Sequence, residues 1–203
     1  MAGKPFAIFI SGVPGTGKTT LAMKLAQDLG IDQVVSTDTV RAVLRSVGDE
    51  NKNPILFSVS HDSWKYFGEK NAQNIWKGFI VHSKIIFPVM VYMLKKSFEE
   101  GRSIIFEGVH ITPEFIQGLD FPNLFSFFII VSEDSILKDR YSMKNSFRSI
   151  PHKGWEKNFD VIRFIESKIL EDKKCFTRVL ENKEIFDSTN KILEVINEVL
   201  SDK

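Results

Sequence analysis

The segment Gly12–Thr19, with the sequence GVPGTGKT, restricts the possible folds more than any other part of this chain. It matches the spacing G-x-x-x-x-G-K-[ST] at every fixed position. An apolar run, Pro5–Ser11, precedes it, and the apolar residues of Thr19–Leu29 recur at helical spacing. We therefore expect a buried strand, a glycine-rich turn and a helix in direct succession.

A glycine-rich turn between a strand and a helix is suited to binding phosphate. The N–H groups of the loop and of the helix N-terminus converge on phosphate oxygens, and glycine permits the close approach. Lys18 would lie between the β- and γ-phosphates of a nucleotide, and the Thr19 hydroxyl would bind Mg²⁺. The nucleotide-binding residues predicted in this loop are Gly12, Val13, Pro14, Gly15, Thr16, Gly17, Lys18, Thr19 and Thr20.

The length favours a single domain over residues 1–203, or one domain with a sizeable insertion. The 27 basic and 26 acidic residues give a net charge of +1, whereas a protein that binds nucleic acid carries a basic excess. The single cysteine, Cys175, indicates a reducing compartment. The N-terminus has no signal-peptide pattern, and the longest apolar run, Ile85–Leu94, is half of the roughly 20 residues that a membrane span needs. We expect a soluble, cytoplasmic monomer or homodimer with no nucleic-acid or membrane partner.

Apolar strand-like runs alternate with helical patterns, which predicts an α/β fold with a parallel sheet covered on both faces. The predicted strands are Pro5–Ser11, Gln33–Ser36, Ser103–Phe106, Leu124–Val131 and Thr177–Leu180. The predicted helices are Thr19–Leu29, Asp38–Val47, Gly78–Glu100 with a kink at Pro88, Glu133–Arg148, Trp155–Lys174 and Ser188–Leu200 with Ser188 as N-cap. Residues 54–78 show no clear period, and we interpret them as a helical segment on the substrate side.

Two acidic residues follow predicted strands, at the edge of a parallel sheet where chemistry is usually located. Asp38 follows the second strand, and helical spacing places it on one face with Arg41 and Arg45. A carboxylate that can accept a hydroxyl proton, beside an arginine that can hold an anion, is typical of a kinase. Glu107 lies at the carboxyl end of the third strand, where it would hold an Mg²⁺-bound water or a substrate hydroxyl, and His110 follows it.

Residues 134–153 are predicted to form a lid. Arg140, Lys144 and Arg148 are spaced by four residues and form one basic stripe on a helix. Such a stripe, closing over the transferring phosphate, would exclude water and stabilise the charge of the transition state. A solvated helix face is the alternative interpretation of the same spacing.

A phosphate-binding loop alone does not separate switches, motors and kinases. No segment completes the guanine-reading pattern N-K-x-D, since the candidate Asn182–Ile185 lacks the Asp. Small-molecule and nucleotide kinases remain, with Lys18, Asp38 and Arg140 as catalytic residues. The alternative from another class is a nucleotide-binding switch or regulatory ATPase, which needs neither Asp38 nor a basic lid.

The motifs GVPGTGKTT, VVSTDTVRAVLR and EGRSIIFEGVHITP occur in the order found in archaeal 2-phosphoglycerate kinases, and the chain resembles this family from Phe6 to Asn182. The resemblance implies a three-layer αβα P-loop kinase with a five-stranded parallel sheet in the order 2-3-1-4-5 and a helical lid. It also implies ATP and Mg²⁺ as cofactors. The residues on its motif positions are Asp38, Arg41, Glu107, His110, Arg140, Arg163 and Asn182.

The chain departs from this family on the substrate side. The strand before the loop starts almost at once, His82 stands where the family carries glutamine, and Leu137 stands where it carries histidine. Such drift is typical of a relative with another substrate, such as mevalonate 3-phosphate 5-kinase.

We therefore expect transfer of a γ-phosphoryl group to a hydroxyl of a small phosphorylated carboxylic acid. The first expectation is the 5-hydroxyl of mevalonate 3-phosphate, and the alternative is 2-phosphoglycerate, giving 2,3-bisphosphoglycerate. The predicted substrate-binding residues are Asp38, Arg41, Arg45, His61, Lys65, Glu107, His110 and Arg163. Thr19 and Glu107 are the predicted metal ligands, and Arg140, Lys144, Arg148 and Asn182 complete the nucleotide side.

Overall fold

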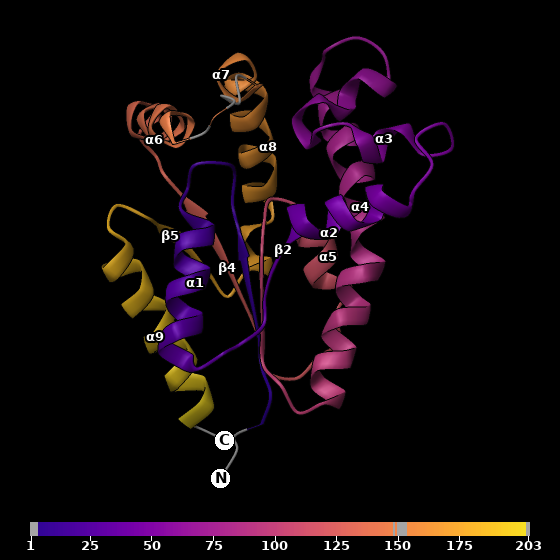
Figure 1. The fold of residues 1–203 in the computed structure, drawn as a ribbon. Helices are drawn as coiled ribbons and strands as arrows, with labels where there is room; N and C mark the ends of the chain where they lie inside the picture. The colour runs from indigo at the N-terminus through magenta and orange to yellow at the C-terminus, as the bar shows by residue number, and fades with distance from the viewer. Residues whose placement is uncertain (1–3, 148, 150–153, 202–203) are drawn as a thin grey trace.

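The computed structural model describes residues 4–147, 149 and 154–201 (Figure 1). Its centre is a sheet of five parallel strands in the order β2-β3-β1-β4-β5, which confirms the predicted order. The strands are β1 Ala7–Ser11, β2 Val34–Ser36, β3 Ile104–Glu107, β4 Leu124–Ile130 and β5 Arg178–Glu181. All carboxyl ends therefore lie at one edge of the sheet.

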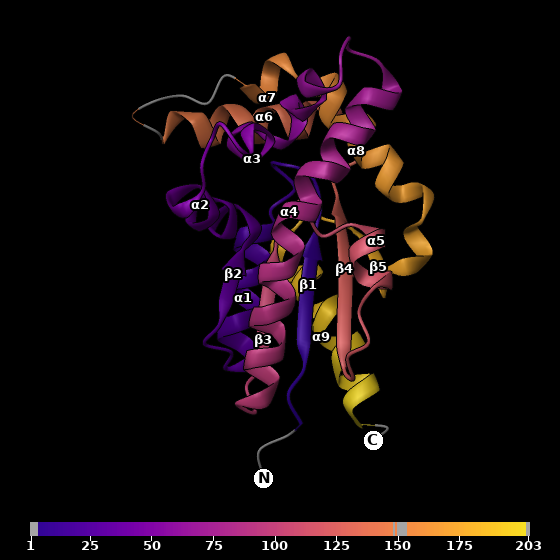
Figure 2. The same ribbon diagram turned by 90° about the vertical axis from the view of Figure 1, so that its right-hand side faces the viewer.

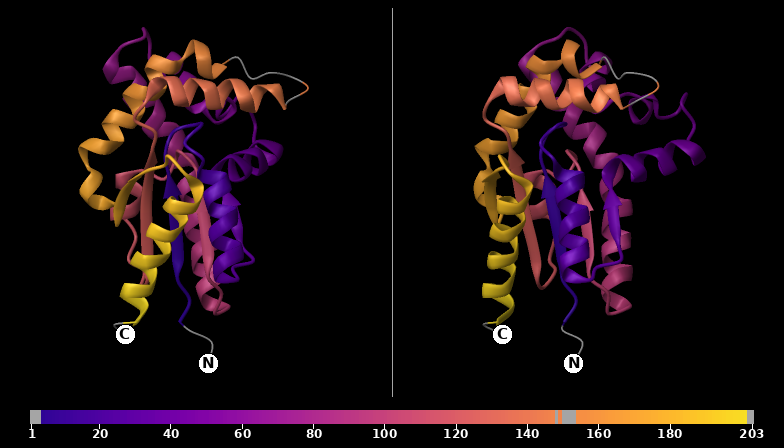
Figure 3. Two further views of the ribbon diagram at one scale, coloured as in Figure 1. Left: turned by 90° about the vertical axis from the view of Figure 1, so that its left-hand side faces the viewer. Right: turned by 60° about the vertical axis from the view of Figure 1, so that its left-hand side comes forward.

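Helices cover both faces of the sheet, so the fold has three layers (Figures 1 and 3). Helices α1 (Lys18–Leu29) and α9 (Ile185–Ser201) lie on one face. Helices α4 (Ala72–Glu99), α5 (Pro113–Gln117) and α8 (Phe159–Glu171) lie on the other. The three-layer αβα architecture is confirmed.

Strand β1 shows why the strands are apolar along their whole length. Ala7 and Phe9 pack into the core beneath α4 and α8, whereas Ile8 and Ile10 pack into the core beneath α1 and α9. Because both faces are covered, alternate residues of the strand are buried on opposite sides.

The lid lies above the carboxyl ends of the strands (Figure 2). It contains α6 (Asp134–Ser146) and α7 (Gly154–Lys157). A small core joins it to the sheet, formed by Val13, Val131, Leu137, Tyr141 and Ile162. Residues 148 and 150–153 of the predicted lid, including Arg148, lie outside the described residues.

Residues 54–78 combine three elements. Helix α3 (Pro54–Phe57) is followed by the 3₁₀ helix η1 (Ser60–Tyr66), and α4 already begins at Ala72. The predicted start at Gly78 was wrong, because the Asn71 side chain accepts a hydrogen bond from the Asn74 N–H and caps the helix earlier. Helix α2 (Thr37–Val47) lies beside this segment, and α4 continues through Pro88.

Two other helix boundaries differ from prediction. Helix α9 begins at Ile185, so Ser188 lies inside it, and its hydroxyl donates to Asn182 Oδ1 (2.9 Å) instead of capping the helix. The single helix predicted over Trp155–Lys174 is divided at Asn158, which donates to the Gly154 carbonyl (2.9 Å). The 3₁₀ helix η2 (Lys173–Cys175) follows it.

By length and composition, α4 is the one helix of the described residues that meets the criteria for a membrane span. Core helices of soluble proteins meet the same criteria. Here α4 packs against the sheet, and four of its residues are fully buried in the core between them: Phe79, Ile86, Met90 and Leu94.

The close packing of α4 against η1 leads to a first prediction. A Cβ atom on Gly78 would lie 2.5 Å from the Trp64 backbone nitrogen and 2.6 Å from the Ser63 carbonyl carbon. Gly78→Ala should lower the free energy of unfolding by about 1–3 kcal/mol, because backbone atoms must move apart. Urea unfolding would measure the loss.

Gly118→Ala is the matched control, because a Cβ there would meet its nearest neighbours at 3.5 Å, an ordinary van der Waals distance. Equal unfolding midpoints for the two variants would contradict the described packing of α4 on η1.

Candidate active site

A cavity of about 590 Å³ opens at the carboxyl ends of the strands. Its floor is the loop after β1 with the start of α1, one wall is formed by α2 and η1, and the facing wall is the lid. The predicted site residues that line it are Pro14, Gly15, Gly17, Lys18, Thr19, Thr20, Asp38, Arg41, His61, Glu107, Arg140 and Lys144. Gly12, Val13 and Thr16 are buried in the floor.

The loop is held in a conformation that glycine favours. Gly12, Gly15 and Gly17 have φ values of 147°, 81° and 90°. The buried Lys18 ammonium donates to the Val13 carbonyl at 2.8 Å. Burial lowers the pKa of Lys18, and the charges of Glu107 and Asp38 oppose the shift.

The lid and the loop after β5 pack directly on this floor. A Cβ on Gly15 would lie 2.4 Å from the Tyr141 ring, and one on Gly17 would lie 2.5 Å from Asn182 Nδ2. Asn182 was predicted to bind nucleotide. It is 1% exposed and donates to the Thr16 carbonyl at 2.7 Å, so the structure places it as a support of the loop.

The predicted metal ligands lie side by side. The Thr19 hydroxyl donates to Glu107 Oε1 at 3.1 Å, and Glu107 is buried at the end of β3. A hydroxyl and a carboxylate are hard oxygen ligands, which suit Mg²⁺. Within the described residues no group of three His, Cys, Asp or Glu side chains forms a metal site. Two protein ligands are nevertheless sufficient, because Mg²⁺ in kinases is also held by phosphates and water.

Asp38 and Arg41 form an ion pair on the wall of the cavity that α2 forms, which faces the lid. The Ser36 hydroxyl caps α2 by accepting from the Asp38 N–H (3.2 Å), which brings Asp38 to the end of β2. Arg41 Nη2 lies 3.0 Å from Asp38 Oδ1. The Arg41 side chain is 15% exposed, and among the described residues its Nε has no hydrogen-bond partner. An anion in the cavity would supply an acceptor for this arginine.

Four of the predicted substrate residues do not line the cavity: Arg45, Lys65, His110 and Arg163. Arg45 donates to the backbone carbonyls of Leu56 (2.8 Å) and Ser58 (2.5 Å), and thereby joins α2 to the segment before η1. Lys65 is 58% exposed and pairs with Asp62 at 2.9 Å.

His110 is fully buried behind the cavity wall. Its Nδ1 lies 2.9 Å from Thr37 Oγ1, and its ring stacks on His82 with the centroids 5.1 Å apart. Burial lowers the pKa of His82 to about 4, and the charge of Arg41 adds to the shift. Burial also lowers the pKa of His110. The two imidazoles are therefore neutral at pH 7.

The lid wall carries the two described members of the basic stripe. Arg140 Nη2 donates to the carbonyls of Asn182 (3.0 Å) and Lys183 (3.3 Å). The Lys144 ammonium lies 5.3 Å from the centroid of the Trp155 ring. Arg163, predicted to bind substrate, lies in a separate network beneath the lid.

Sequence reasoning missed seven residues that line the cavity, all of them uncharged. They are Val59, Ser60, Gly108, Val109, Met143, Phe147 and Trp155. Met143 and Phe147 are spaced by four residues on the predicted lid helix, and this spacing was the available signal.

Solved structures show which class of fold this is. The chain superposes on a gluconokinase from Sinorhizobium meliloti 1021 with a TM-score of 0.58 and 12% identity, covering 98% of this chain and 96% of that one. A shikimate kinase from Acinetobacter baumannii, solved with shikimate, gives a TM-score of 0.54 and 15% identity, covering 98% and 95%. The family model described as "AAA domain" matches residues 8–80. The fold is that of the small-molecule P-loop kinases.

Similarity of sequence identifies relatives more specifically than similarity of fold. The chain is 30% identical over 200 residues to the 2-phosphoglycerate kinase of Methanocaldococcus jannaschii, covering 97% of this chain and 65% of that protein. It is 30% identical over 203 residues to the enzyme of that name from Methanopyrus kandleri, covering 97% and 62%. The predicted resemblance is confirmed: archaeal 2-phosphoglycerate kinases are homologues over most of this chain, which spans less than two thirds of their length.

The buried imidazoles predict how stability depends on pH. The pKa of His82 falls from an ordinary 6.5 to about 4 on folding, so the folded state resists its protonation. This contribution to stability is complete above pH 6.5 and is lost as the pH falls toward 4. Between pH 7.5 and 5 the loss should reach about 2 kcal/mol.

Urea unfolding at both pH values would measure it. His82→Gln should show a smaller decrease on acidification than the wild type, whatever its stability at pH 7.5. Parallel pH curves for the two proteins would contradict the assignment.

Proposed function

We propose that this protein is an ATP- and Mg²⁺-dependent kinase that phosphorylates a hydroxyl of a small phosphorylated carboxylic acid. The observation that carries the proposal is the composition of one cavity: Lys18 and Thr19 form its floor, and the Asp38–Arg41 pair faces the lid across it. The homology to 2-phosphoglycerate kinases supports the same reaction class.

The nucleotide side is built from the loop and the lid. When bound, Mg²⁺ neutralises charge on the phosphate oxygens. Thr19 and Glu107 would hold it, and the loop N–H groups and Lys18 would hold the phosphates. Arg140 and Lys144 supply positive charge from the opposite wall, where negative charge develops during transfer.

The acceptor side requires a residue that orients a hydroxyl and one that holds an anion. Asp38 is 70% exposed, so its carboxylate is available to a substrate hydroxyl and can accept its proton. Arg41 presents a planar guanidinium beside it, which suits a carboxylate or a phosphate. His61 lines the same wall and is nearly buried.

The acceptor to be tested first is 2-phosphoglycerate, because the archaeal homologues carry that name. Mevalonate 3-phosphate, the first expectation from sequence, gains no support from these relatives. Both are small phosphorylated acids with a free hydroxyl, so the same cavity chemistry would serve either.

The proposed reaction implies a cytoplasmic protein whose partner is a small anionic metabolite. A monomer or a homodimer satisfies it equally. A nucleotide-binding switch is the weaker candidate, because a switch binds no acceptor and does not require the Asp38–Arg41 pair on the wall of the cavity.

The test is a screen of phosphorylated small acids for acceptor-dependent release of ADP. Lys18→Ala is the control for contaminating kinases, since it removes the charge that faces the phosphates. Slow ATP hydrolysis that no acceptor stimulates would favour the switch.

Asp38→Asn should lower kcat by about 10²–10⁴ with the acceptor found in that screen, because a positioned base contributes that much. The KM for ATP should change little, since Asp38 lies on the acceptor wall. A loss confined to the KM for ATP would instead place Asp38 among the groups that hold the metal.

Arg41→Ala should raise the KM of the acceptor by roughly 10–100-fold, because a charge-assisted hydrogen bond is lost. Arg41→Lys should restore only part of this, since an ammonium cannot form two parallel bonds. Arg178→Ala, which changes an exposed arginine at the amino end of β5, is the matched control. Unchanged acceptor KM with a raised KM for ATP would assign Arg41 to the nucleotide.

A further inference from the structure

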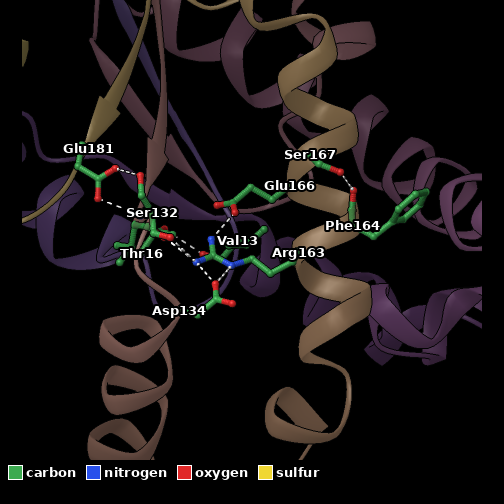
Figure 4. A network of polar contacts seen from close by, with 10 residues as sticks. Val13, Thr16, Ser132, Asp134, Arg163, Phe164, Glu166, Ser167 and Glu181 are labelled. Carbon is green, nitrogen blue, oxygen red and sulfur yellow. Dashed lines mark hydrogen bonds and ion pairs between the residues drawn. The ribbon is translucent and has the colours of Figure 1, made fainter.

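Arg163 of α8 makes a dense set of contacts directly below the lid (Figure 4). Its Nη2 donates to the Val131 carbonyl at 2.8 Å, and its Nε donates to Asp134 Oδ1 at 2.9 Å. Its Nη1 donates to Glu166 Oε2. The guanidinium thus contacts the residue that follows β4, the first residue of the lid helix α6, and its own helix.

These partners belong to the two segments that connect the lid to the sheet. Val131 and Ser132 form the connection from β4 into α6, and α8 follows the lid in the chain. Ser132 is fixed in turn, since its N–H donates to Glu181 Oε1 (2.9 Å) at the end of β5. Arg163 therefore joins both connections at one point, as Figure 4 shows.

The electrostatics favour a fixed role over substrate binding. Glu166 is 6% exposed, and burial raises its pKa, an effect that the hydrogen bond from Arg163 opposes. If Arg163 turned toward a substrate, the Glu166 carboxylate would remain buried without its cation, which is strongly unfavourable. Arg163 also lines a separate hollow of about 390 Å³, away from the cavity of the site.

The lid helix begins at this junction. Asp134 begins α6, and Leu137 and Tyr141 of the same helix pack on the phosphate loop. Arg140 and Lys144 project from the same helix into the cavity. A displacement at Asp134 would therefore move both cations relative to the loop.

We propose that Arg163 is a positioning residue: it fastens the two connections of the lid together and so fixes where Arg140 and Lys144 stand over the phosphate loop. Its effect on catalysis rests on the proposed kinase function, whereas its effect on the lid does not.

The test combines hydrogen exchange with kinetics. In Arg163→Gln, without any ligand, the amides of α6 should exchange about tenfold faster or more, because hydrogen bonds to a charged group are lost. The amides of β1 and α1 should keep their rates. With an acceptor present, kcat should fall about tenfold while the acceptor KM stays within about twofold. Arg163→Lys should lie between the wild type and Arg163→Gln in both measurements.

A second variant separates the junction from general stability. Asp134→Asn removes only the lid-side carboxylate, so α6 should exchange faster while α8 keeps its rates. Glu133→Gln is the matched control, because it removes a charge at the same end of α6 from an exposed residue whose side chain makes no capping bond. Its α6 amides should exchange as in the wild type.

Unchanged α6 exchange in both Arg163→Gln and Asp134→Asn would overturn the proposal. A tenfold higher acceptor KM with wild-type kcat in Arg163→Gln would also overturn it and would make Arg163 a substrate ligand. If the wild type transfers no phosphoryl group, the kinase function fails, and the exchange rates still decide the role of Arg163.

Discussion

The conformation of the phosphate loop is the constraint on which the rest of the site depends. Gly15 and Gly17 have positive φ and no room for a side chain, because Tyr141 of the lid and Asn182 after β5 press against them. The loop is thus shaped from three directions: by β1 before it, by the lid above it and by the amide of Asn182 beside it. Phosphate-binding N–H groups, lid and sheet edge are consequently parts of one packed unit.

Much of this fold could be predicted from the sequence, because buried parallel strands are apolar on both faces and are visible as short runs such as that ending at Ser11. The strand order came from family resemblance and not from periodicity. The first residues of helices were less predictable, because they depend on which of several nearby polar side chains caps the helix. Asn71 caps α4 within a polar segment, and Ser188, a good cap by type, is drawn into the network of Asn182.

The site was predictable where the backbone fixes a residue, as at Lys18, and where a strand end presents one, as at Asp38 and Glu107. The roles of long cationic side chains were less predictable, because their partners depend on tertiary structure. The sequence shows that Arg45 is a cation, but only the structure shows that its guanidinium donates hydrogen bonds to two backbone carbonyls. The spacing of charges identifies the basic stripe of the lid, but it carries no signal for the aromatic ring of Trp155, which lines the same wall of the cavity.

The contact between the Lys18 ammonium and the Val13 carbonyl has a consequence for nucleotide affinity. An ammonium has three N–H donors, so Lys18 can keep this carbonyl and still donate to a phosphate. Because the contact holds the side chain in the floor of the cavity, the lysine loses less conformational entropy when a phosphate binds. The Val13 carbonyl thus preorganises the cation of the loop, and the affinity for a nucleotide phosphate benefits from an ordering cost that folding has already met.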